Sequence, residues 1–80
     1  MTPFSALLAS LKPSGDAFTV EVTPDWMQGR TTYGGLSGAI CVEAARRAIP
    51  DLPRLRSAQF AFIGPAGGPV TATPTVLRQG

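Results

Sequence analysis

Apolar residues recur along this chain with two different spacings, and the spacings predict most of its secondary structure. Residues 4–11 carry apolar side chains at i, i+3, i+4 and i+7, namely Phe4, Leu7, Leu8 and Leu11. This spacing predicts a short amphipathic helix. Residues 17–23 alternate instead, with Phe18, Val20 and Val22 on one face, which predicts a half-buried strand. A turn at residues 12–16, rich in Pro, Ser and Gly, separates the two elements.

The longest periodic segment is residues 34–49, which contain no proline and predict a helix that ends at Pro50. Its apolar positions cover about 200° of the circumference: Ile40, Cys41, Val42, Ala44, Ala45, Ala48 and Ile49. The remaining arc carries Glu43, Arg46 and Arg47, together with Leu36 and Ala39. We therefore expect a mostly enclosed helix in which Cys41 is a small buried residue. Gly38, inside the helix, indicates the close approach of another group.

Two further strands are expected after this helix. Residues 54–63 are expected to form a strand with Arg56, Ala58, Phe60 and Phe62 on one face and Leu55, Ser57, Gln59, Ala61 and Ile63 on the other. Residues 70–78 are rich in Thr and Val, and Pro74 places that strand at an edge or a bulge. The Gly- and Pro-rich residues 64–69 predict a hairpin-type loop between them. The resulting order α-β-α-β-β is that of an α+β domain, which we place over residues 1–80.

Composition narrows the class of protein. The chain has 80 residues, 7 Lys and Arg against 5 Asp and Glu, and 44% hydrophobic residues, which is typical of one small globular domain. Scattered cations and a net charge of +2 argue against nucleic-acid binding. Histidine chemistry is excluded because the chain has no His, and one cysteine cannot form an internal disulfide. No apolar run is long enough for a bilayer, so we expect no membrane partner and a cytoplasmic location.

Residues 29–39, Gly-Arg-Thr-Thr-Tyr-Gly-Gly-Leu-Ser-Gly-Ala, resemble the helix start of acyl-CoA thioesterases of the thioesterase II group. Several later blocks agree in order and spacing: residues 55–60, 62–65, 68–70 and 76–80. The resemblance implies a hot-dog fold, in which a curved antiparallel sheet wraps around one long central helix. It further implies the amino-terminal part of the first of two hot-dog modules, with no cofactor and no metal.

The resemblance also directs attention to the start of the long helix. Free backbone N–H groups at Gly34 and Gly35, at the positive end of the helix dipole, are suited to polarising a thioester carbonyl. The alternative is that these glycines only permit a turn and tight packing. Glu43 is the catalytic candidate, since some hot-dog thioesterases use a helix carboxylate. A salt-bridging face with Arg46 and Arg47 is the competing explanation.

Aromatic and cationic residues supply the remaining candidates. Tyr33, Leu36 and Phe60, together with Gly34 and Gly35, form the expected substrate-binding set. Trp26 and Phe62 fit either an acyl tunnel or plain core packing, and Gln59 fits either a ligand hydrogen bond or strand pairing. Arg30, Arg54 and Arg56 fit either the phosphates of coenzyme A or a solvated surface.

Two functions follow from these residues. The first is hydrolysis of acyl-CoA thioesters, in which this chain is the scaffold half, inactive alone, and the main acid comes from elsewhere. The second is a non-catalytic hot-dog module for acyl binding or assembly. Either one implies a partner, a second hot-dog module or another copy, because the strand at residues 70–78 leaves an unpaired edge.

Overall fold

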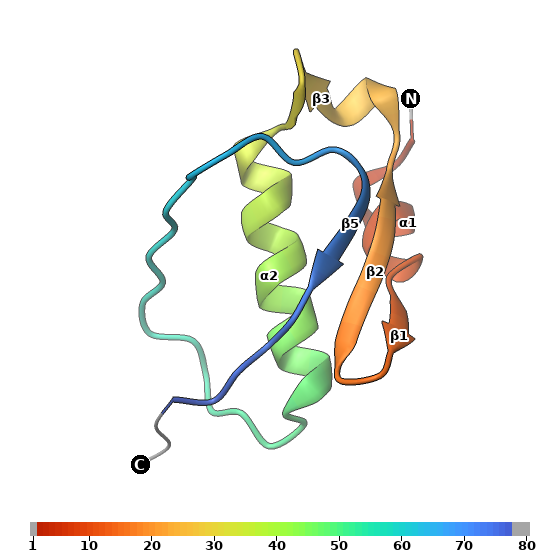
Figure 1. Cartoon of the computed structure of the whole chain (residues 1–80). Coiled ribbons are helices and arrows are strands. Elements are labelled where there is room, and N and C mark those ends of the chain that lie inside the picture. Colours follow the sequence, from red (N-terminus) through yellow and green to blue (C-terminus); the bar gives the residue numbers. More distant parts are fainter. Residues whose placement is uncertain (1, 78–80) are drawn as a thin grey trace.

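The computed structural model describes residues 2–77, which form an α+β domain with two antiparallel sheets (Figure 1). In chain order its elements are α1 (Phe4–Ala9), β1 (Lys12–Ser14), β2 (Ala17–Val22), a short 3₁₀ helix η1 (Pro24–Trp26), β3 (Met27–Gln28), β4 (Thr31–Thr32), α2 (Gly34–Ala48) and β5 (Gly68–Ala72). The α+β class is confirmed, but the order differs from the expected one. Two small hairpins precede α2, and within residues 49–77 a single strand follows it.

Both hairpins turn on a glycine that the sequence supplies at the first loop position. β1 pairs with β2 across Gly15, and β3 pairs with β4 across Gly29; each glycine has a φ of +64°. A two-residue hairpin loop favours glycine where φ is positive, because other residues meet a steric penalty there. The hydrophobic pattern does not predict β1, since its three residues are all exposed and carry no apolar alternation.

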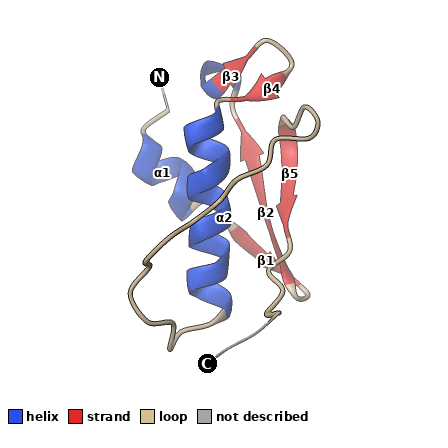
Figure 2. Ribbon diagram, turned by 90° about the vertical axis from the view of Figure 1, so that its left-hand side faces the viewer, coloured by secondary structure: helices blue, strands red, loops and turns tan. Residues whose placement is uncertain are grey.

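The core forms where β2 meets the two helices. β2 lies between β1 and β5 in the three-stranded sheet, and α1 and α2 cover the same side of that sheet (Figure 2). Seven buried side chains make up this core: Leu7, Leu11, Val20, Val22, Leu36, Ile40 and Ala44. The alternation predicted for β2 is confirmed, with Val20 and Val22 buried and Phe18 packed against them.

The predicted strand at residues 54–63 and the hairpin-type loop at residues 64–69 are wrong. Residues 52–63 have no regular structure, and every residue from Pro50 to Ala66 is exposed. β5 instead pairs with β2 over Gly68–Ala72. Residues 54–63 therefore have no neighbouring strand to pair with their backbone N–H and C=O groups. Only the first part of the strand expected at residues 70–78 is observed, and its end at Arg78 lies outside the described residues.

Helix α2 is less enclosed than its composition predicts. Leu36, assigned to the polar arc, is 1% exposed and lies at the centre of the core, whereas Cys41, Val42 and Ala48 are exposed. The core side of α2 is therefore set by its largest aliphatic residues, Leu36 and Ile40. The expectation that Cys41 is buried is wrong, because Cys41 lies on a different side of α2 from the core residues Leu36, Ile40 and Ala44.

The charged side chain of Arg47 is tolerated beside the core because its guanidinium is hydrogen-bonded. Its guanidinium donates to the backbone oxygens of Leu8 and Leu11, at 2.9 and 2.8 Å, and to Glu43 at 2.7 Å. These bonds join α2 to the chain at and just after the end of α1, where the Leu8 oxygen also accepts a hydrogen bond from Leu11 N–H at 3.2 Å. Arg47 thus joins the two helices, on the side of α2 that faces α1.

Candidate functional site

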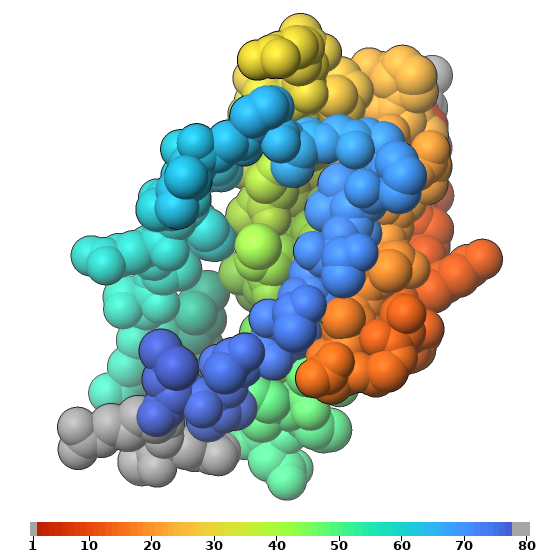
Figure 3. Space-filling model, viewed as in Figure 1, coloured from red at the N-terminus to blue at the C-terminus, as the bar shows by residue number. Residues whose placement is uncertain are grey.

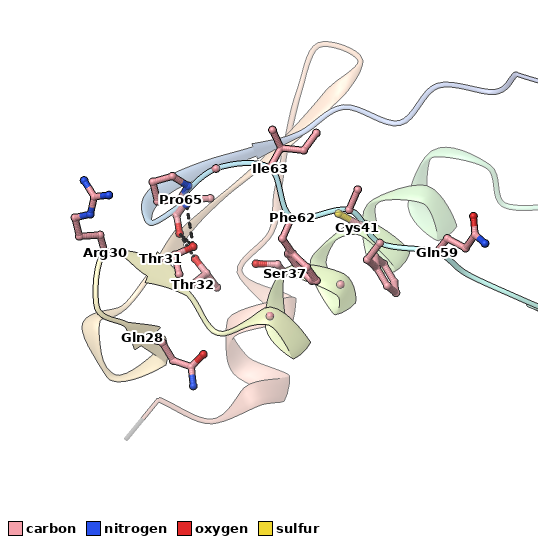
Figure 4. Close-up of a pocket in the computed structure, with 16 residues that line it drawn as sticks. Gln28, Arg30, Thr31, Thr32, Ser37, Cys41, Gln59, Phe62, Ile63 and Pro65 are labelled. Atoms are coloured by element: carbon pink, nitrogen blue, oxygen red, sulfur yellow. Dashed lines mark hydrogen bonds between the residues drawn. The ribbon is translucent and has the colours of Figure 1, made fainter.

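A cleft of about 880 Å³ lies beside the first two turns of α2. One wall is the helix face that carries Gly34, Ser37, Gly38 and Cys41, at i, i+3, i+4 and i+7. The β3–β4 hairpin and the extended residues 59–66 complete the lining (Figure 4). The space-filling view shows the opening between this extended segment and α2 (Figure 3). The small residues of α2 therefore form one wall of a cleft rather than part of the core.

The end of the extended segment is fixed to β4. Thr32 donates from both its backbone N–H and its hydroxyl to the carbonyl oxygen of Ala66, the latter at 2.7 Å. Ala66 N–H donates in return to the Thr31 hydroxyl at 3.1 Å. Gly67, the next residue, packs against the end of the Met27 side chain from β3. The Thr31–Thr32 pair thus anchors one end of the cleft.

The backbone at the start of α2 keeps two donors free. Tyr33 N–H donates to Trp26, and Leu36 and Ser37 N–H groups both donate to the Tyr33 oxygen. Within residues 2–77, Gly34 and Gly35 N–H groups have no acceptor, and no side chain caps this turn. Free amides at the positive end of a helix dipole favour an anion or a polarised carbonyl oxygen.

Two phenylalanine rings rest on the glycines of this face. A Cβ at Gly38 would lie 3.3 Å from the Phe60 ring, and one at Gly34 would lie 3.4 Å from the Phe62 ring. The close approach expected at Gly38 is therefore confirmed, and the approaching group is Phe60. Both rings remain substantially exposed, at 48% and 68%, so they bound the cleft without filling it.

The chemistry of the cleft is that of binding and polarisation. Its hydroxyl, thiol and amide groups come from Ser37, Cys41, Gln28 and Gln59, and its charged group from Arg30. Among the described residues no carboxylate lines it. The arrangement can hold an apolar chain and polarise a carbonyl group, but it supplies no general base for activating water.

The structure places the predicted binding residues in three environments. Gly34 and Phe60 line the cleft, and Gly35 borders a smaller adjoining cleft. Tyr33 is 48% exposed and its ring lies against Gly35. Leu36 lies on the opposite side of α2, in the core. Trp26 also packs at the edge of the core, donating its Nε1–H to the Thr2 oxygen at 2.8 Å.

Glu43 lies on the α1 side of the helix, away from the cleft. Its carboxylate accepts hydrogen bonds from Arg46, at 2.9 and 3.1 Å, and from Arg47 at 2.7 Å. The salt-bridging face expected from the i+3 and i+4 spacing is confirmed. Hydrogen bonds from Arg46 and then Arg47 hold the pKa of Glu43 below its ordinary value. The carboxylate is thus kept charged, with both neighbouring guanidinium groups bound to it.

This lowered pKa predicts a specific loss of stability in acid. A carboxyl group whose pKa is lower in the folded state stabilises the fold above its unfolded pKa of 4.5, and this contribution is lost as the pH falls through the folded pKa. We expect Glu43→Gln to cost about 1 kcal/mol at pH 7. The cost should shrink toward zero near pH 3, as measured by urea denaturation at both pH values.

A matched control is Glu21→Gln, because Glu21 lies on the exposed face of β2 and forms no ion pair with residues 2–77. It should change stability little at either pH. An equal cost for Glu43→Gln at pH 7 and pH 3 would show that the ion pairs do not contribute as described.

Several cleft residues were not singled out as binding residues by their sequence pattern: Thr31, Thr32, Ser37 and Cys41. The available signal was the helical spacing of Gly34, Ser37, Gly38 and Cys41, which places four small residues on one face. The hydrophobic pattern hides this spacing, because it counts Cys41 as apolar and so predicts that Cys41 lies in the core. The role of the Thr31 and Thr32 hydroxyl groups cannot be predicted from the local sequence, because their hydrogen-bond partner Ala66 is far away along the chain.

The structure is a small α+β domain with a cleft beside the start of its long helix α2. The family model described as acyl-CoA thioesterase N-terminal domain matches residues 22–80, well over half of the chain. The chain therefore belongs to this family, whose substrates are acyl-CoA thioesters. No curated protein and no solved structure gave a significant match. Neither of the described helices has the length and apolarity that crossing a bilayer requires.

Proposed function

We propose that this chain is the substrate-holding half of an acyl-CoA thioesterase built from two hot-dog modules of the thioesterase II type. In this proposal α2 is the central helix and the sheet β1-β2-β5 is part of the curved sheet. The observation that carries the proposal is the cleft beside α2, with Gly34 in its wall and the Gly34 and Gly35 N–H groups free.

The proposed mechanism assigns the chain a polarising role. The thioester carbonyl oxygen accepts hydrogen bonds from Gly34 and Gly35 N–H, which stabilises the negative charge that develops when water attacks. Phe60 and the small residues Gly38 and Cys41 contact the apolar part of the ligand. The group that activates water is contributed from outside the described residues, because no carboxylate lines the cleft.

Glu43 receives a positioning role in this proposal rather than a catalytic one. Its carboxylate is bound to two arginines on the side of α2 that faces α1. A nucleophile or general base needs a free carboxylate within reach of the substrate. We therefore assign Glu43 to holding Arg47, which in turn joins α2 to the end of α1.

An acyl-CoA hydrolysis assay on the chain, with a parallel binding measurement, tests this assignment. We expect binding of an acyl-CoA without turnover above the uncatalysed background, and the same result for Glu43→Gln. Turnover that Glu43→Gln abolishes would identify Glu43 as the catalytic group. If the chain binds no acyl thioester, the proposed function is wrong.

A second candidate is a non-catalytic acyl-binding or assembly module, and the cleft without a carboxylate favours it. The two candidates predict the same binding by this chain. They differ when a second hot-dog module is present: hydrolysis that depends on an acid of that module supports the thioesterase. Tight binding with no hydrolysis in the assembled protein supports the binding module.

A further inference from the structure

A second cleft, of about 860 Å³, lies near the other end of α2. Three arginines line it, Arg46 from α2 and Arg54 and Arg56 from the extended segment. Its apolar lining comes from Val42, Leu52 and Leu55, together with smaller residues. The arginine cleft therefore combines cations with an apolar floor, a combination that differs from the amide- and hydroxyl-lined cleft at the helix start.

The charge of the arginine cleft is uncompensated. No carboxylate lines it, and within residues 2–77 neither Arg54 nor Arg56 forms an ion pair. Arg46 is bound to Glu43, but that carboxylate is shared with Arg47. An anion bearing several oxygens is the ligand that such a group of guanidiniums favours, because each can donate two parallel hydrogen bonds.

The two clefts are joined by a third. This middle cleft, of about 600 Å³, has an almost wholly apolar lining that includes Ala39 and Gly35. It shares Val42 with the arginine cleft and Phe60 with the cleft at the helix start. Together they form one groove between α2 and the extended segment, and Figure 3 shows the openings along it.

The length of the groove defines the shape of its ligand. Eleven residues of helix separate Gly34 from Ala45, which corresponds to about 16 Å along the axis. A ligand that occupies both ends is long and thin, with a polarisable carbonyl at one end and an anionic group at the other. Acyl-CoA has this arrangement, since its thioester is separated from its phosphates by a narrow flexible arm.

We propose that the arginine cleft binds the phosphorylated headgroup of acyl-CoA, with Arg54 and Arg56 as its main phosphate ligands. The arm then lies in the middle cleft, and the thioester reaches Gly34 and Gly35. This inference rests on the proposed function, because it takes the helix start as the position of the thioester. It fixes the direction of the ligand: headgroup toward the end of α2, acyl chain toward the β3–β4 hairpin.

The test is calorimetric titration of the chain with coenzyme A, with adenosine 3′,5′-bisphosphate, and with a phosphate-free N-acetylcysteamine acyl thioester. The Arg54→Gln, Arg56→Gln double variant should bind the first two at least tenfold more weakly. Its affinity for the phosphate-free thioester should be unchanged. The Arg54→Lys, Arg56→Lys double variant should recover part of the affinity for the two phosphorylated ligands, because lysine keeps the positive charge but lacks the planar guanidinium group.

Lys12→Gln is the matched control, since Lys12 is an exposed cation of β1 that lines none of the three clefts. It should leave coenzyme A binding unchanged. The inference is overturned if the double variant does not weaken coenzyme A binding, if Lys12→Gln weakens it as much as the double variant does, or if the intact chain binds neither phosphorylated probe. The proposed function fails separately, if the phosphate-free thioester does not bind the intact chain.

Discussion

Leu36→Ala is expected to remove a large part of the stability of this domain. The side chain is 1% exposed and packs between α1, β2 and the body of α2, so its loss leaves a cavity that the small core cannot refill. Such a replacement costs about 2–5 kcal/mol, against a total of about 4–12 kcal/mol for a domain of this size. Thermal denaturation should show a melting temperature lower by more than about 10 °C.

This variant also decides between two roles for Leu36. The sequence resemblance made it a candidate for substrate binding, whereas the structure directs its side chain into the core. Leu52→Ala is the control, since Leu52 is 42% exposed, and it should change stability by less than about 0.5 kcal/mol. A Leu36→Ala protein that melts normally but binds acyl thioester poorly would mean that α2 is rotated relative to the arrangement described.

Gly38→Leu is expected to block the groove while keeping the helix. A side chain at this position would extend into the contact between α2 and the Phe60 ring. Leucine is the better helix former by about 1 kcal/mol, so helix content should not fall. Affinity for a phosphate-free acyl thioester should fall at least about tenfold, or about 1.4 kcal/mol, in a calorimetric titration.

Ala48→Leu provides the matched comparison, because Ala48 is exposed near the end of the same helix and lines none of the three clefts of the groove. It should leave thioester affinity unchanged. Gly38→Ala should give an intermediate loss, since its Cβ displaces the Phe60 ring only slightly. Full affinity in Gly38→Leu, with circular dichroism confirming the helix, would place the ligand elsewhere.

The sequence predicted those elements whose signal is local. Phe18, Val20 and Val22 alternate and form the buried face of β2, and residues 34–49 give a helix because they contain good helix formers and end at a proline. The pairing of Glu43 with Arg46 and Arg47 also follows from spacing along one helix. Each of these depends on neighbours within a few residues, so no tertiary information was needed.

The sequence-based predictions that are wrong concern segments whose structure depends on contacts with residues far away along the chain. Residues 54–63 were predicted to form a strand, but a strand also needs a partner, and β5 pairs with β2 instead. On α2, Arg47 is bound to the carbonyl oxygens of Leu8 and Leu11, which lie 36 to 39 residues away in sequence. A hydropathy pattern assigns arginine to solvent and cannot anticipate such a contact.

The candidate site was predictable in part for the same reason. Gly34 and Gly35 were recognisable because a glycine pair at a helix start has a local meaning, free amides without a side-chain cap. Phe60 of the opposite wall was also in the expected binding set, but the wall as a whole was not predictable, because its position depends on the anchoring of Ala66 by Thr31 and Thr32. The sequence already made Arg54 and Arg56 candidates for the phosphates of coenzyme A, with a solvated surface as the alternative, and the structure adds the cleft that they line.

Backbone amide NMR of the chain during titration with a phosphate-free acyl thioester tests most directly whether the start of α2 receives the thioester. We predict that the largest chemical-shift changes occur at Gly34 and Gly35, with smaller ones at Ser37 and Gly38. Saturating ligand that leaves these four amides unshifted, while signals elsewhere in the domain move, would contradict the assignment of this helix start as the carbonyl-binding site.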